Sequence, residues 1–182
     1  IDLGGTFARA AVVSTEGQVL ASAKTALADR QPEAVVEAIT HAVNGAIASA
    51  GNVSVDGCGV GVAGQLGEGG TVIVAPNLGW RNVAFGTLLS SRLGRSVRVV
   101  NDLAAAAWGE LAAGAGKGAS DIFVVFVGSG VGSAIISGGR WVRGSTSVDP
   151  FGCRIPFAMG SVISVAALPM SIWPQAMFHC RP

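Results

Sequence analysis

The chain opens with IDLGGTFARAAVVSTEGQVLASAKT, residues 1–25, in which an apolar segment meets a Gly-Gly pair and then continues as an alternating run. Gly4 and Gly5 permit a tight turn because neither carries a Cβ atom. The TEGQ stretch at residues 15–18 is typical of a second turn. The pattern predicts an antiparallel meander of three strands, joined by a glycine turn and a polar turn.

A second segment, DIFVVFVGSGVGSAIISGGRWVRG at residues 121–144, has the same design of apolar strand, glycine turn and strand. A further hairpin is expected at its SGG stretch, residues 137–139. Two segments of one design indicate two related α/β units, each of which offers a hairpin to a shared cleft. We therefore expect a first unit over residues 1–116 and the start of a second over 121–149.

Helices and strands are expected to alternate between these two segments. Residues 31–51 predict a helix, because apolar side chains recur every four positions along one stripe, namely Val35, Ile39, Val43 and Ile47. A second helix is expected over residues 82–94, with an inward face of Phe85, Leu88, Leu89 and Leu93. The remaining expected elements are buried strands at 58–64, 71–77 and 97–100, a helix from Asp102 to about Ala113, and a linker at 113–120.

The composition excludes several classes of function. With 13% charged residues and a net charge of +1 among 182 residues, neither a nucleic-acid-binding face nor an acidic tail is expected. The mean hydropathy of +0.55 reflects alanine and valine spread along the chain, as in a buried sheet. No membrane span is expected, because three prolines interrupt the uncharged stretch at 155–180. No signal peptide is visible, so a cytoplasmic location is expected.

Residues 150–182 differ in composition from the residues before them. All eleven acidic residues precede Pro150, whereas all three methionines and five of the seven prolines follow Asp149. We expect this segment to be an atypical tail. The cysteines are too widely spaced for a disulfide framework or a zinc knuckle, and incidental thiols are expected at Cys58, Cys153 and Cys180.

Each glycine turn is a candidate phosphate site. In DLGGT, the backbone N–H groups of Gly4 and Gly5 and the hydroxyl of Thr6 suit an anion, and Asp2 suits a hydrated Mg²⁺ ion. An ordinary glycine hairpin is the alternative. The GSGVG turn is neither a Walker A loop nor a Rossmann turn, and its candidate phosphate-binding residues are Gly128, Ser129 and Gly130.

Asp102 stands where the VRVVN strand gives way to the LAAAAWGE helix. Phosphoryl transfer to an alcohol needs positioned phosphates, a metal and a group that accepts the hydroxyl proton. A carboxylate between two phosphate hairpins is placed to accept that proton. Asp102 also suits a helix N-cap, and the two roles are compatible.

Taken together, these motifs resemble those of the ROK family of sugar kinases, in the actin/hexokinase/Hsp70 superfamily. The resemblance covers residues 1–145 and rests on DLGGT, GVAGQL, APNLGW, NDLAAAAWGE and VGSGVGSAIISGGRWVRGS, in that order. It implies an α/β chain with a ribonuclease-H-like (actin-like ATPase) lobe and a partial second lobe.

The resemblance further implies an activity, a glucokinase-type phosphorylation of a hexose at its 6-hydroxyl by ATP and Mg²⁺, as in glycolysis. Glucose is the expected hexose, while other hexoses and polyphosphate as the donor stay open, as does a homodimer. Asp102 would be the base. The implied sugar-binding residues are Gly64, Asn77, Asn101 and Asp102.

The sequence departs from the family after Ser145. The family continues with Gly-Glu-x-Gly-His, but this chain has no Glu after Glu110, and the family's Cys/His zinc site is not found. Two alternatives therefore stay open beside the kinase: the sugar-sensing lobe of a ROK-type transcriptional regulator, and a non-catalytic remnant.

Overall fold

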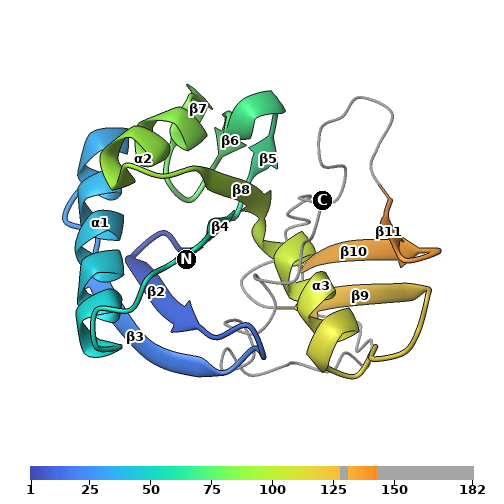
Figure 1. Ribbon diagram of the computed structural model, residues 1–182. Coiled ribbons are helices and arrows are strands. Elements are labelled where there is room, and N and C mark those ends of the chain that lie inside the picture. The colour runs from blue at the N-terminus through green and yellow to red at the C-terminus, as the bar shows by residue number, and fades with distance from the viewer. Residues whose placement is uncertain (128–130, 143–182) are drawn as a thin grey trace.

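The computed structural model describes residues 1–127 and 131–142 and contains a five-stranded sheet in the order β3-β2-β1-β4-β8 (Figure 1). β1 pairs antiparallel with β2 and parallel with β4, β2 pairs antiparallel with β3, and β4 pairs parallel with β8. The predicted meander is confirmed, and so is the ribonuclease-H-like sheet that the resemblance implied. The strands are Asp2–Leu3 (β1), Phe7–Val13 (β2), Val19–Ala26 (β3), Cys58–Val62 (β4) and Val97–Asn101 (β8).

Helix α1, Pro32–Ser49, covers one face of this sheet, as the four-residue periodicity predicted (Figure 1). Pro32 stands in its first turn, and Gly51 follows its end with a φ of 85°. Val35 and Ile39 are fully buried, together with the small Ala8 of β2. Small residues on the sheet let the helix approach closely, and this packing forms the main core.

A second, three-stranded sheet of β5 (Gln65–Leu66), β6 (Val72–Ala75) and β7 (Trp80–Val83) branches from the end of β4, with the short helix η1 (Glu68–Gly70) inside it. The helix predicted from residue 82 was wrong at its start. Residues 82 and 83 belong to β7, which pairs with β6, and helix α2 begins at Phe85. Asn82 has a φ of 51°, a left-handed conformation that a right-handed helix excludes.

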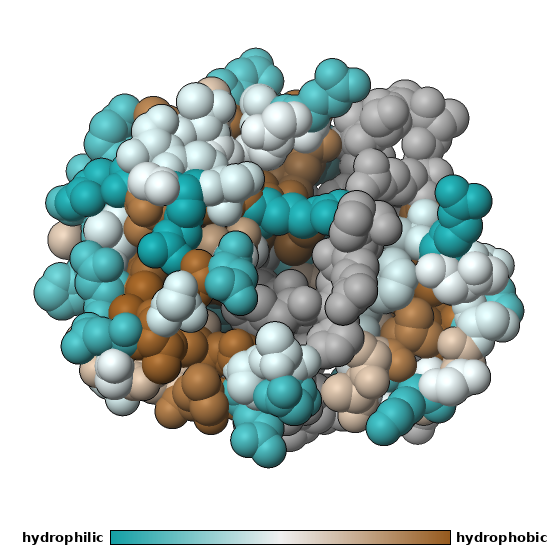
Figure 2. Space-filling view, viewed as in Figure 1, coloured by the Kyte–Doolittle hydropathy of each residue, from teal (hydrophilic) through white to brown (hydrophobic). Residues whose placement is uncertain are grey.

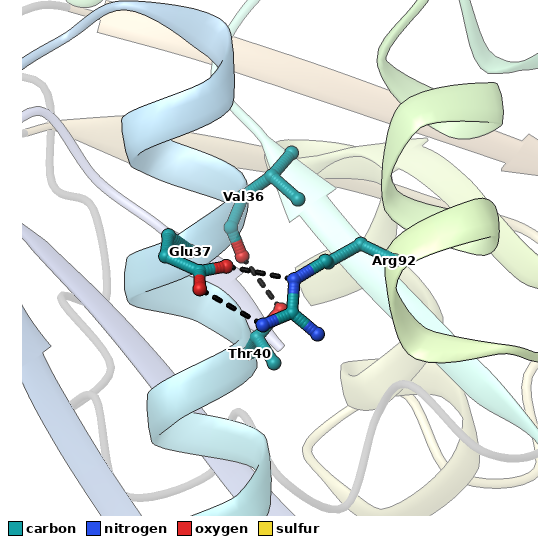
Figure 3. A network of polar contacts seen from close by, with 4 residues as sticks. All are labelled: Val36, Glu37, Thr40 and Arg92. Atoms are coloured by element: carbon teal, nitrogen blue, oxygen red, sulfur yellow. Dashed lines mark hydrogen bonds and ion pairs between the residues drawn. The ribbon is translucent and has the colours of Figure 1, made fainter.

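Helix α2, Phe85–Leu93, buries Phe85 and Leu89 as predicted and ends at Gly94, which has a φ of 63°. It lies beside α1, where Arg92 donates two hydrogen bonds of 2.8 Å to the Glu37 carboxylate (Figure 3). Both side chains are exposed, so this ion pair contributes little stability beyond the orientation it gives the helices.

Helix α3, Asp102–Ala113, leads from β8 to a third sheet in the order β11-β10-β9 (Figure 1). These strands are Ile122–Val127 (β9), Val131–Ser137 (β10) and Arg140–Trp141 (β11). Their small core joins Ala134 and Ile136 to Ala107 of α3. Residues 114–121 connect α3 to β9 and cover nearly all of the predicted linker at 113–120. The predicted tail at 150–182 lies outside the described residues.

Within residues 1–127 and 131–142, no helix has both the length and the apolar character that crossing a membrane requires.

Candidate active site

Three parallel strands end at one edge of the five-stranded sheet. Leu3 of β1 pairs with Val62 of β4, and Val62 pairs with Asn101 of β8, so the segments that follow them emerge side by side. Those segments carry Gly4 and Asp102. In open α/β sheets, ligands bind beyond the carboxyl ends of the strands, which makes this edge the candidate site.

The first glycine turn is closed by a hydrogen bond of 3.0 Å from the Gly4 N–H to the Phe7 carbonyl. A Cβ atom on Gly5 would lie 3.3 Å from the Asn77 carbonyl oxygen, so this turn packs against the APNLGW segment. The Thr6 carbonyl accepts a hydrogen bond of 2.9 Å from the Leu27 N–H, which ties the turn to the end of β3. The hairpin is as predicted, and its phosphate-binding role stays a prediction.

Gly64, just beyond β4, leaves no room for a side chain. A Cβ atom there would lie 2.5 Å from the Val74 carbonyl oxygen and 3.2 Å from the Ala75 Cβ atom. The Gly64 carbonyl accepts a hydrogen bond of 3.1 Å from the Asn101 side-chain amide. The structure therefore brings Gly64 and Asn101 together at the strand ends, and their sugar-binding roles stay predictions.

The N-cap of α3 is Asn101, not Asp102. The Asn101 Oδ1 atom accepts hydrogen bonds from the backbone N–H groups of Leu103 and Ala104, at 3.0 and 3.1 Å. Asp102 is the first residue of the helix. Because Asn101 satisfies two of the N–H groups that a helix start leaves open, the Asp102 carboxylate is not needed as the cap.

Burial is the main cause that raises the pKa of Asp102 to about 6. The negative charge of Asp2 raises it further, while a hydrogen bond of 2.9 Å from the Leu103 N–H to Oδ1 acts in the opposite direction. A pKa near the working pH suits a group that must accept a proton and release it in each cycle. Asp2 is in register with Gly61 and Gly61 with Val100, so Asp2 lies near the same edge of the sheet as Asp102.

Asp2 forms an ion pair with Arg9, in which the Arg9 Nη1 atom lies 3.0 Å from Asp2 Oδ2. The two residues are register partners on β1 and β2. Sequence reasoning missed Arg9, although the expected hairpin would have found it by counting outward from the Gly-Gly turn.

The donor set at this edge fits Mg²⁺. Mg²⁺ takes one or two carboxylates together with waters and substrate phosphates, and Asp2 offers a carboxylate that is 21% exposed. A Mg²⁺ site of this kind does not need three or more protein ligands. Where the structure describes the chain, no group of three or more His, Cys, Asp or Glu side chains is placed to hold a metal ion.

The second hairpin begins beside the first turn of α3. A side chain on Gly132, the second residue of β10, would collide with the Leu103 side chain. β9 and β10 therefore approach the helix end that carries Asp102. The predicted phosphate residues Gly128, Ser129 and Gly130 lie outside the described residues, as do Cys153 and Cys180. Cys58 is a free, half-buried thiol whose pKa burial raises.

A groove of about 470 Å³ lies at the opposite edge of the same sheet. Its lining is largely apolar and includes Val12 of β2, Val43 of α1 and Cys58 at the amino end of β4. Figure 2 shows apolar residues gathered over this part of the molecule, around the lower ends of α1 and β3 in Figure 1. The groove lies at the amino end of β4, whereas Asp102 follows the carboxyl end of the neighbouring β8, so it is separate from the candidate site.

The family model described as "ROK family" matches residues 1–151. The chain belongs to the ROK family. It is 40% identical to a glucokinase of Streptomyces coelicolor over 149 residues, which are 81% of this chain and 46% of that protein. It is also 37% identical to a xylose repressor of Caldicellulosiruptor bescii over 90 residues, 49% of this chain and 23% of that protein.

A solved ROK glucokinase from Streptomyces griseus, in complex with glucose and AMPPNP, has the same fold as this ROK chain. The two superimpose with a TM-score of 0.71 at 37% identity, over 89% of this chain and 49% of that one. The chain thus spans about half the length of the glucokinases it matches. The actin-like ATPase fold expected from the sequence is confirmed.

Proposed function

We propose that this chain is the nucleotide- and sugar-binding part of a ROK kinase that transfers the γ-phosphoryl group of ATP to the 6-hydroxyl of a hexose, with glucose as the first candidate. The observation that carries the proposal is the Asp102 carboxyl, half-buried at the ends of three parallel strands with a pKa of about 6. The glucokinase relatives, one of them solved with glucose and AMPPNP, support the choice of substrates.

In this proposal Asp102 accepts the proton of the sugar hydroxyl while that oxygen forms its bond to the γ-phosphorus. The bond between the γ-phosphorus and the bridging oxygen breaks, and ADP leaves. Neighbouring backbone and amide groups orient the sugar: Gly64, Asn77 and the Asn101 Nδ2 hydrogen that does not bind Gly64. The reaction would take place where β1, β4 and β8 end.

The phosphates would lie between the two glycine hairpins. Backbone N–H groups can bind phosphate oxygens directly, and in turns rich in glycine no side chain blocks the approach of the phosphate. Mg²⁺, held through Asp2, would neutralise charge on the phosphates. The proposed phosphate-binding residues are Gly4, Gly5, Thr6, Gly128, Ser129 and Gly130. The Gly4 N–H donates to the Phe7 carbonyl, so Gly4 would contribute the room that its missing side chain leaves for a phosphate. A cytoplasmic role in carbohydrate metabolism belongs to the same proposal.

The test combines binding with turnover. Calorimetric titration with ATP-Mg²⁺ and with glucose should detect both ligands, and a coupled ADP-release assay over a panel of hexoses should name the sugar. Asp102→Asn should lower kcat 100- to 10,000-fold, the range of general-base catalysis, with little change in nucleotide affinity. Asp121→Asn, an exposed aspartate outside the site, is the matched control. Turnover that survives Asp102→Asn would remove Asp102 as the base.

A sugar-sensing role is the second candidate, and the similarity to a xylose repressor supports it. A sensor would bind the sugar without ATP-Mg²⁺ and would release no ADP. The same titrations therefore separate the two functions.

A further inference from the structure

The side chain of Asn101 connects two segments that lie 37 residues apart in the sequence. It is buried, with 4% of its surface exposed. Its Oδ1 atom caps α3 by accepting hydrogen bonds from the N–H groups of Leu103 and Ala104. Its Nδ2 atom donates a hydrogen bond of 3.1 Å to the Gly64 carbonyl. One amide group therefore holds both the start of the helix and the loop after β4.

Capping alone does not require an asparagine. Serine and aspartate cap helices about as well, because each offers an oxygen to the same N–H groups. Neither can also make the contact to Gly64 from this position, since a carboxylate has no hydrogen to donate and a serine hydroxyl is shorter. The combination of acceptor and donor on one planar group is what Asn101 adds.

The loop after β4, which carries Gly64, is tightly packed. Gly64 lies against the backbone of β6, where an added Cβ atom would come within 2.5 Å of the Val74 carbonyl oxygen. Gly64 is therefore held on two sides, because its Cα faces β6 and its carbonyl binds the Asn101 amide. Because the Gly64 carbonyl is fixed in place, the hydrogen bond to it restricts the position of the Asn101 side chain.

Asp102 is the next residue after Asn101, and the two side chains share one donor. The Leu103 N–H lies 3.0 Å from Asn101 Oδ1 and 2.9 Å from Asp102 Oδ1. Among the described residues, the charged group that acts on this carboxylate is Asp2 on β1, which itself pairs with Arg9 on β2. The place of the Asp102 carboxylate thus depends on how Asn101 is held.

We propose that Asn101 is a positioning residue, whose side-chain amide clamps the Gly64 loop onto the first turn of α3 and so sets the position of the Asp102 carboxylate. The catalytic meaning of the clamp rests on the proposed function. The clamp itself does not, and it can be tested in the absence of turnover.

Two variants separate the clamp from the cap. Asn101→Ser keeps a neutral N-cap and loses the contact to Gly64, whereas Asn101→Ala loses both. Ser90→Ala is the matched control, because it removes one hydrogen bond of 3.1 Å, to the Val97 N–H at the opposite end of β8. NMR of the 18.1 kDa chain then follows the Gly64 carbonyl resonance and the titration of the Asp102 carboxyl.

Both Asn101 variants should shift the Gly64 resonance and lower the pKa of Asp102. In both variants a looser junction would admit water, and in Asn101→Ala the Leu103 N–H would also donate to Asp102 alone, so we expect a fall of about one pH unit in the titration midpoint. Ser90→Ala should change neither signal. If Asn101→Ser leaves the Gly64 resonance and the Asp102 midpoint as in the parent chain, Asn101 is only a cap and the proposal is wrong. Asn101→Ser decides this even where Asn101→Ala fails to fold.

Kinetics add a second readout. Asn101→Ser should lower kcat at least tenfold while the KM for ATP stays unchanged. Because Asn101 is also proposed to contact the sugar, the pH profile of kcat separates the two roles: only displacement of Asp102 would move its midpoint together with the NMR titration of Asp102. An equal kcat in Asn101→Ser and the parent chain would contradict the positioning role. A parent chain without turnover would count against the proposed function alone, since the NMR signals judge the clamp independently.

Discussion

The hairpin of β1 and β2 lies inside a five-stranded sheet, whereas the hairpin of β9 and β10 lies in a sheet of three. The first shares a large core with α1, in which Ile39 and Phe85 are fully buried. Among the described residues, the second shares with α3 a core of three buried residues, and its Phe123 is 65% exposed. Two segments with the same sequence pattern thus bury different amounts of apolar side chain. The difference arises because burial depends on the helix that packs on each sheet.

The aspartates of the two regions differ in the same way. Burial raises the pKa of Asp102 to about 6. Asp121 is exposed, and hydrogen bonds from Ser120, Ser137 and the Gly138 N–H lower its pKa to about 2. Environment, rather than residue type, separates a carboxyl that can exchange protons near neutral pH from one that stays charged.

The largest effect is expected from truncating the two cores. Ile39→Ala should lower the free energy of unfolding by about 4 kcal/mol, within the usual 2–5 kcal/mol for a fully buried isoleucine. Ile136→Ala should cost about half as much, because fewer buried neighbours surround it. Urea denaturation measures both. Equal losses of unfolding free energy would mean that Ile136 is packed as closely as Ile39.

Asp102→Asn should stabilise the chain in a pH-dependent way. The folded pKa of Asp102 lies above its unfolded value, so the folded state keeps the proton longer, and the parent chain loses stability as pH rises from about 4 to 6. Above pH 7 the variant should exceed the parent by up to about 3 kcal/mol, from two pKa units of about 1.4 kcal/mol each. At pH 4 the two unfolding free energies should coincide. A difference that does not change with pH would contradict this account.

One substitution can be compared in both regions. Gly64→Ala should cost about 1–3 kcal/mol, because its Cβ atom meets a backbone carbonyl that cannot rotate away. Gly132→Ala should cost less, because its Cβ atom meets the end of the flexible Leu103 side chain. Thermal unfolding of both variants gives the ranking, and the reverse order would show that the Gly64 loop yields more easily than the helix start.

The smallest effect is expected at Asp121. Asp121→Asn should lower the melting temperature slightly at pH 7, because the charged carboxylate accepts three hydrogen bonds there. With its pKa lowered, this contribution is present above about pH 4 and disappears as pH falls through about 2. Melting curves between pH 7 and pH 2 should therefore converge for the variant and the parent.

The elements of both regions could be predicted from local pattern. Glycine pairs, alternating strands and the four-residue stripe of α1 all lie within a few neighbouring residues, and the structure confirms the elements they predicted. The junction that carries Asp102 was found for the same reason. The prediction that a helix begins at Asn82 was wrong, because pairing of β7 with β6 decides the backbone conformation there.

The sequence by itself determined the order of the elements, the glycine turn at Gly4 and Gly5 and the place of an acid between a strand and a helix, because each depends on residues close together in the chain. Only the tertiary structure decided that Asn101 caps α3 and that its amide reaches Gly64. Which of several suitable polar groups meet is settled by the packing of strands that bring distant segments within hydrogen-bond reach, and composition and spacing do not contain that distance.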